Sequence, residues 1–104
     1  MKEAHMFDWL QFEKHEGTWK KKDLVVLALS TCGFCKRGME YLNARDIDYK
    51  YVYLDNLSKE ERKKVSEEFR DNFKQRSLFP ALIIDNTDFQ LGFIEKAWDR
   101  SLGL

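Results

Sequence analysis

The fold of this chain is decided by the stretch Leu24-Val25-Val26-Leu27-Ala28-Leu29-Ser30-Thr31-Cys32-Gly33-Phe34-Cys35. Its first six residues form an unbroken apolar run, which is typical of a strand buried on both faces of a parallel sheet. From Cys35 onward, Met39 and Leu42 recur at helical spacing and predict a helix that ends near Arg45. The two cysteines therefore lie where a buried strand gives way to a helix.

The rest of the chain predicts a strand, a helix, two strands and a final helix. The signals are a β-rich run from Tyr49 to Leu54, a capping box at Ser58 and Glu61 that opens a charged helix over residues 58–76, strands at Ala81 to Ile84 and Phe89 to Leu91, and a last helix marked by Ile94, Ala97, Trp98 and Leu102. The first half is a βαβ unit, which requires parallel strands and a right-handed crossover. We therefore predict an α/β protein with a four-stranded mixed sheet flanked by three helices.

Residues 1–22 precede this pattern as an N-terminal extension, and residues 23–104 form the domain. Met6, Trp9 and Leu10 suit a helix, whereas Phe7, Trp9 and Gln11 alternate as in a strand. We expect a short helix packed on the core.

Composition excludes several function classes. The 104 residues fit one domain, and 18 basic side chains cancel 18 acidic ones, so nothing favours a nucleic-acid partner or an anionic membrane. The longest apolar run, Leu24 to Leu29, is too short to span a bilayer, and Met1 to His5 lack a signal-peptide pattern. We expect a cytoplasmic protein. Thiols stay reduced in that compartment, and a close cysteine pair there is catalytic or metal-binding more often than structural.

The Cys32-Gly33-Phe34-Cys35 motif carries the chemistry. A zinc site needs four ligands, but the chain has no further cysteine, and its two histidines, His5 and His15, lie in the poorly patterned extension. We therefore expect no bound metal. A CxxC pair beside a βαβ unit is instead the signature of a thioredoxin-like redox site.

The predicted position of each cysteine assigns its role. Cys32 stands at the helix start, where free amides and the helix dipole favour a thiolate. Because the dipole supplies only about 0.3–1 kcal/mol, hydrogen bonds to the sulfur must add to it. Lys36 and Arg37 either support the thiolate or are simply solvated. We predict that Cys32 attacks and that Cys35, one turn into the helix and less exposed, resolves. Phe34 is expected to be an exposed contact for partners.

The chain from about Leu24 to Leu102 resembles the glutaredoxin branch of the thioredoxin-fold family. The resemblance rests on the order of elements, on Thr31-Cys32-Gly33-Phe34-Cys35, and on Phe79-Pro80 before the third strand. It implies a cis proline opposite the active cysteine and a Phe79 backbone that pairs with a bound thiol substrate. The substrate- or thiol-binding positions that it implies are Thr31, Gly33, Phe34, Lys36, Phe79, Pro80, Gly92, Phe93 and Glu95.

Two departures leave the electron donor open. Many glutathione-using members carry a lysine where this chain has Leu29, and a Gly-Gly pair with acidic residues where this chain has Leu91-Gly92-Phe93-Ile94-Glu95. The resemblance therefore implies the family's fold and dithiol chemistry for this chain, but it does not imply specificity for glutathione. We expect a monomer without a tightly bound cofactor. It would reduce protein or small-molecule disulfides with electrons from glutathione, another small thiol or a thioredoxin-reductase-like protein.

A second hypothesis comes from Gly33-Phe34. This pair also resembles monothiol glutaredoxins, which carry serine in place of Cys35 and share an iron–sulfur cluster between two protomers through two thiols. On that hypothesis the protein is a cluster carrier. An absorption spectrum and an iron assay on anaerobically purified protein distinguish it from a reductase.

Overall fold

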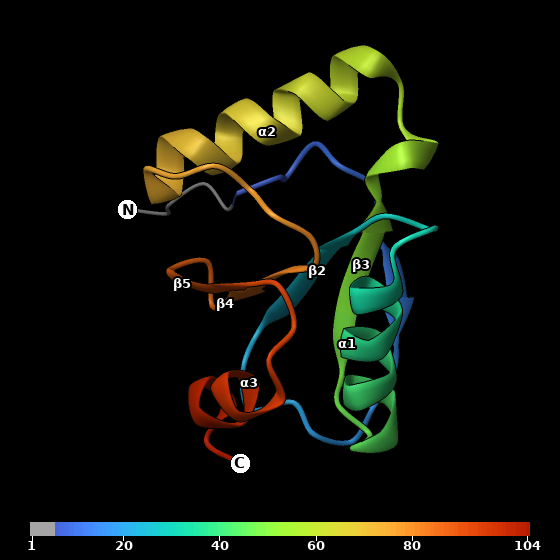
Figure 1. The fold of residues 1–104 in the computed structure, drawn as a ribbon, viewed down its shortest axis with the longest axis vertical. Helices are drawn as coiled ribbons and strands as arrows, with labels where there is room; N and C mark the ends of the chain where they lie inside the picture. The colour runs from blue at the N-terminus through green and yellow to red at the C-terminus, as the bar shows by residue number, and fades with distance from the viewer. Residues whose placement is uncertain (1–5) are drawn as a thin grey trace.

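The computed structural model describes residues 6–104, and Figure 1 shows the arrangement of their helices and strands. The elements in chain order are β1 (Glu13–His15), β2 (Leu24–Ala28), α1 (Gly33–Ala44), β3 (Tyr49–Tyr53), the 3-10 helix η1 (Leu54–Asn56), α2 (Lys59–Phe73), β4 (Ala81–Ile84), β5 (Asp88–Leu91) and α3 (Glu95–Leu102).

The strands form one mixed sheet in the order β1-β3-β2-β4-β5. Strands β2 and β3 are parallel, as the βαβ prediction requires, and the other neighbouring pairs are antiparallel. All five residues of β2 are buried, because this strand lies at the centre of the sheet with a covered surface on both sides. The predicted α/β thioredoxin-like fold is confirmed. The sheet, however, has five strands among the described residues, where the sequence pattern predicted four.

The additional strand comes from the N-terminal segment, where the expected helix is wrong. Residues 6–10 form turns, and Phe7 has a positive φ of 64°, which a helix does not allow. Strand β1 then pairs with β3, with His15 opposite Tyr49. Its sequence, Glu13-Lys14-His15, has no apolar alternation that would mark a strand. Tertiary contacts hold it instead, including an ion pair of 2.5 Å between Lys14 and Asp48.

Two layers of helix cover the sheet: α1 and α3 lie on one face, and α2 lies on the other (Figure 1). The core under α1 and α3 includes Met39, Leu42 and Trp98, and the core under α2 includes Val65 and Phe69. Phe7 and Leu10 are buried in the α2 core, so the N-terminal segment does pack on the domain. None of the helices formed by residues 6–104 is long and apolar enough to cross a membrane.

Local signals at the helix ends act largely as predicted. Ser58 is the N-cap of α2: its hydroxyl accepts from the Glu61 amide at 3.1 Å, and its own amide donates to the Glu61 carboxylate at 3.0 Å. Gly38 lies inside α1 and is buried. A Cβ at this position would lie 2.8 Å from the Trp98 ring, so the close approach is between α1 and α3.

Candidate active site

Cys32 is the N-cap residue of α1 and has an extended backbone, with φ −93° and ψ 117°. Its sulfur accepts a hydrogen bond from the Cys35 amide at 3.2 Å, and its carbonyl accepts from the Lys36 amide at 3.1 Å. The sulfur therefore satisfies one of the free amides at the helix start and lies at the positive end of the helix dipole. Both effects place hydrogen-bond donors and positive partial charge at the sulfur of Cys32.

The loop that carries Cys32 is held by a residue far away in sequence. The Ser30 amide donates to Asp55 at 2.9 Å, and the Ser30 hydroxyl donates to the other oxygen of the same carboxylate. These hydrogen bonds lower the pKa of Asp55. Asp55 lies in η1, directly after β3, so this contact ties the end of β2 to the end of its parallel neighbour. Sequence reasoning missed it, because the partners are 25 residues apart.

Cys35 occupies a very different environment from Cys32. Its side chain is 1% exposed, whereas Cys32 is half-buried, and both are free thiols. Burial, together with the side-chain hydrogen bond to Cys32, raises the pKa of the Cys35 thiol to about 12. Only Cys32 is therefore accessible to an incoming sulfur, and Cys35 stays protonated beneath it.

The edge of the sheet next to Cys32 also holds Phe79 and Pro80. Leu27 pairs with Ala81, so the start of β4 lies beside the end of β2, from which the chain continues to Cys32. The Phe79-Pro80 peptide bond is cis, and the Pro80 carbonyl accepts from the Gly92 amide at 2.8 Å. The structure thus brings the predicted Phe79, Pro80 and Gly92 to the sheet edge that leads to Cys32.

Two other predicted site residues lie elsewhere. The Phe93 ring packs against Tyr41 and Trp98, with centroids 5.5 and 4.9 Å away. The Glu95 carboxylate pairs with Arg45 at 3.6 Å. Phe93 and Glu95 therefore contribute to the contact between α3 and the C-terminal half of α1. The structure does not bring Glu95 to Cys32.

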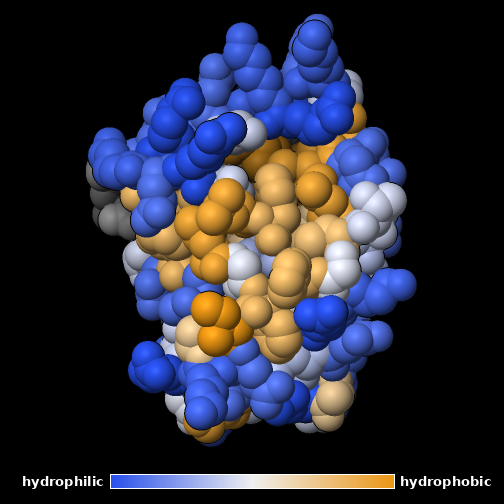
Figure 2. All heavy atoms as spheres, viewed as in Figure 1, coloured by the Kyte–Doolittle hydropathy of each residue, from blue (hydrophilic) through white to orange (hydrophobic). Residues whose placement is uncertain are grey.

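Exposed apolar side chains lie at three places close in sequence to Cys32, Pro80 and Gly92. Phe34 is 58% exposed in the first turn of α1, Leu78 is 57% exposed just before Phe79, and Ile94 is 65% exposed shortly after Gly92. In the view of Figure 2, an apolar area occupies the middle of the molecule and hydrophilic residues surround it. We call these three residues the apolar surface residues.

The remaining predicted positions surround Cys32 in sequence and are exposed: Thr31, Gly33 and Lys36. The Arg37 guanidinium lies over the Phe34 ring, 5.2 Å from its centroid, and so is directed to that ring. Within residues 6–104, no group of three or more His, Cys, Asp or Glu side chains gathers to hold a metal ion.

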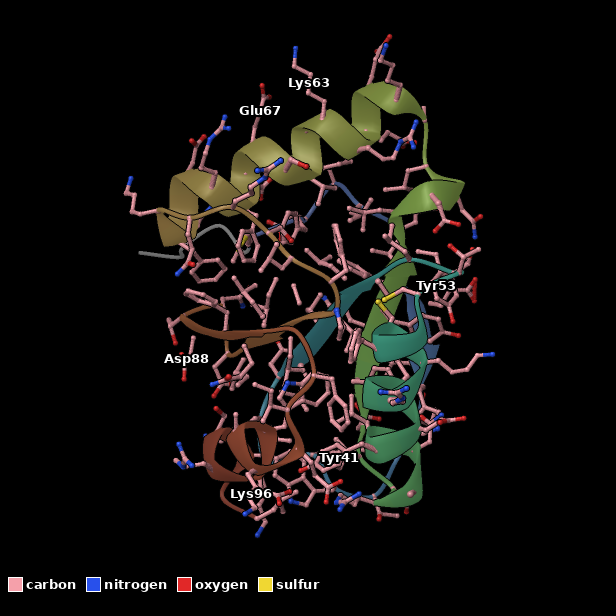
Figure 3. The ribbon with its side chains drawn as sticks, in the orientation of Figure 1. Tyr41, Tyr53, Lys63, Glu67, Asp88 and Lys96 are labelled. Atoms are coloured by element: carbon pink, nitrogen blue, oxygen red, sulfur yellow. The ribbon has the colours of Figure 1, made fainter. Side chains whose placement is uncertain are left out.

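A cavity of about 240 Å³ opens beside Cys32 between α1 and β3. Its apolar wall includes Tyr49, Tyr51 and Tyr53, which follow one another along one face of β3. Figure 3 shows Tyr53 near the N-terminal end of α1. The alternation of the tyrosines in the sequence predicts their common face, but the cavity itself depends on how α1 crosses that face.

The fold and the cysteine pair together define a thioredoxin-fold dithiol protein. A family model described as Glutaredoxin matches residues 21–89. The chain therefore belongs to the glutaredoxin family and is a dithiol oxidoreductase with a CxxC active site.

Solved structures of archaeal proteins are similar over most of the chain. The glutaredoxin of Methanosarcina mazei Go1 is 32% identical, with 90% of this chain and 89% of that chain covered and a TM-score of 0.76. The methanoredoxin of Methanosarcina acetivorans is 30% identical, with coverages of 88% and 96% and a TM-score of 0.77. The glutaredoxin of Archaeoglobus fulgidus is also 30% identical, with coverages of 77% and 85% and a TM-score of 0.67. Among curated proteins, none matches this chain significantly.

Proposed function

We propose that this protein reduces disulfide bonds of other proteins, with Cys32 as the nucleophile and Cys35 as the resolving thiol. The observation that carries the proposal is the asymmetry of the pair. Cys32 is accessible and accepts a hydrogen bond from the Cys35 amide, whereas Cys35 is 1% exposed and its pKa is raised to about 12. An accessible sulfur at a helix start suits the attacking nucleophile, and a thiol buried one turn further on is shielded from the substrate and suits the resolving partner.

The reaction has two exchange steps. The Cys32 thiolate attacks one sulfur of the substrate disulfide, a mixed disulfide forms, and the other substrate sulfur leaves and takes a proton. Cys35 then loses its proton and attacks the Cys32 sulfur, which releases the second substrate thiol. The substrate gains two electrons, and the enzyme is left with a Cys32–Cys35 disulfide.

The surroundings of Cys32 favour a protein substrate. The apolar surface residues Phe34, Leu78 and Ile94 offer contacts to which a polypeptide can dock, since exposed apolar side chains of this kind mark interaction sites. We expect the backbone of Phe79, which precedes the cis Pro80 at the same edge of the sheet, to pair with a substrate chain. Family membership also implies protein disulfides as substrates and a thiol as electron donor.

For the donor we propose a small thiol in the cytoplasm. A buckwheat glutaredoxin of the same fold, 24% identical to this chain, is described as a glutathione complex, and at that identity the likeness extends only to the fold. Glutathione is therefore one member of a donor panel that also contains other small thiols and a thioredoxin reductase.

Single cysteine variants test the assignment of roles. In an insulin-reduction assay, Cys32→Ser is expected to have no activity. Cys35→Ser is expected to accumulate a mixed disulfide that mass spectrometry detects. Lys63→Gln, on the far face of α2, is the control for handling and folding. Full activity of Cys32→Ser would overturn the proposal.

A further inference from the structure

The cavity between α1 and β3 offers a second route to Cys32. Cys32 lines it, whereas Phe79 and Pro80 do not, so a molecule in this cavity contacts Cys32 without occupying the edge proposed for the protein substrate. At about 240 Å³, it is smaller than the roughly 300–1,000 Å³ of common ligand sites. A ligand that fits this cavity must therefore have few heavy atoms.

The apolar wall of the cavity, formed by Tyr49, Tyr51 and Tyr53, is held in place by contacts within the protein. The Tyr51 and Tyr53 rings meet edge to face, with centroids 5.6 Å apart. The Tyr53 hydroxyl lies 3.9 Å from the Met39 sulfur, and the Tyr49 hydroxyl donates to Asn43 at 2.8 Å. An apolar wall with fixed side chains is typical of a ligand site that exists before the ligand binds.

The rim of the cavity carries one charge of each sign. Lys36 and Glu40 are both exposed, both line the cavity, and stand one turn apart on α1, about 6 Å along its axis. Neither forms an ion pair within the described part of the chain. Lys36 is the closer of the two to Cys32 in the helix. A ligand with a carboxylate and an ammonium group next to its sulfur complements this pair.

We propose that this cavity binds a small zwitterionic thiol of the cysteine class, which returns the Cys32–Cys35 disulfide to the dithiol. This inference rests on the proposed function. The thiolate of a first molecule attacks the Cys32 sulfur, the Cys32–Cys35 bond breaks, and Cys35 leaves and takes a proton. A second molecule of the same thiol attacks the bound one, forms a small disulfide and releases the Cys32 thiolate. Two thiols thus supply the two electrons.

A series of small thiols of different charge tests the proposal on the full chain. The series is cysteine, cationic cysteamine, anionic 3-mercaptopropionate and neutral 2-mercaptoethanol, with glutathione as the larger thiol. The measurement is the rate constant for reduction of the oxidised protein, read by alkylation and mass spectrometry. Each rate is divided by that of the same thiol with a small disulfide in solution, which removes intrinsic reactivity. Each rim charge is expected to contribute roughly 2- to 5-fold, so cysteine exceeds 2-mercaptoethanol by roughly 4- to 25-fold.

Two variants separate the rim charges. Lys36→Gln is expected to lower the rate constants for reduction by cysteine and by 3-mercaptopropionate roughly 2- to 5-fold relative to those of the other two small thiols. Glu40→Gln is expected to lower the rate constants for cysteine and cysteamine by the same factor. If Lys36 acted only on the Cys32 thiolate, its variant would change all four rates equally. The matched control is Lys63→Gln with Glu67→Gln, which has the same spacing on α2 and points away from the domain (Figure 3).

The outcomes distinguish the two proposals. Three results would overturn the zwitterion site and leave the reductase assignment intact. They are equal normalised rates for all four small thiols, an equal effect of Lys36→Gln on all of them, and a preference for glutathione over cysteine. A dithiol that reduces no protein disulfide would instead overturn the proposed function. Charge-dependent rates that each rim variant shifts as described support the site.

Discussion

Replacement of Gly38 by alanine tests the contact between α1 and α3. The new Cβ would lie 2.8 Å from Cη2 and 3.3 Å from Cζ3 of Trp98, whereas carbon atoms in contact stand about 3.5–4.0 Å apart. The indole must therefore move by about 0.7 Å or more. It is fully buried, and its Nε1 donates to the Gly92 carbonyl at 3.1 Å, so it has little freedom to do so.

Two opposing effects set the magnitude. In an open helix interior, glycine to alanine stabilises by about 1 kcal/mol, while overpacking a core costs about 1–3 kcal/mol. We expect Gly38→Ala to lower the free energy of unfolding by about 1 kcal/mol, which corresponds to a loss of roughly 4–8 °C in Tm for a domain of this size.

Urea unfolding followed by circular dichroism measures this free energy. Gly33→Ala is the matched control, since a Cβ at Gly33 has no heavy-atom neighbour within 4 Å. It is expected to cause no loss, and Gly38→Val is expected to cause a larger loss than Gly38→Ala. If Gly38→Ala were instead more stable than the wild type by about 1 kcal/mol, the position would be open and the reasoning refuted.

Three further predictions concern a helix cap, acid stability and thiol reactivity. Ser58→Ala removes the α2 cap and is expected to cost about 1 kcal/mol in urea unfolding, whereas Ser66→Ala, inside the same helix, causes no loss. The hydrogen bond from Lys14 lowers the pKa of Asp48, so the stability that it contributes is present above the unfolded pKa of about 4 and lost as pH falls through the lower folded value. The destabilisation caused by Asp48→Asn should therefore shrink between pH 7 and pH 2, and an unchanged difference would contradict this. Because Cys35 is buried with its pKa raised to about 12, iodoacetamide at pH 8 should alkylate Cys32→Ser at least about 10-fold more slowly than Cys35→Ser, and equal rates would contradict it.

Much of the fold follows from local patterns in the sequence. The apolar run at Leu24 to Leu29 predicts the central strand because burial on both faces requires apolar side chains at every position. Ser58 and Glu61 predict the start of α2 because capping depends on residues within one turn. Strand β1 has no such pattern. Three polar residues pair with β3 only because the chain before and after them is held by tertiary contacts.

The sequence by itself determined the central strand, the helix that follows it and the CxxC pair at their junction, because each depends on residues close together in the chain. Only the tertiary structure decided what surrounds that pair. Asp55 anchors the loop before Cys32, Trp98 fills the space left by Gly38, and α1 crosses the tyrosine face of β3 to leave a cavity at the active sulfur. These contacts join residues far apart in sequence. They depend on how the elements pack, which no local spacing encodes.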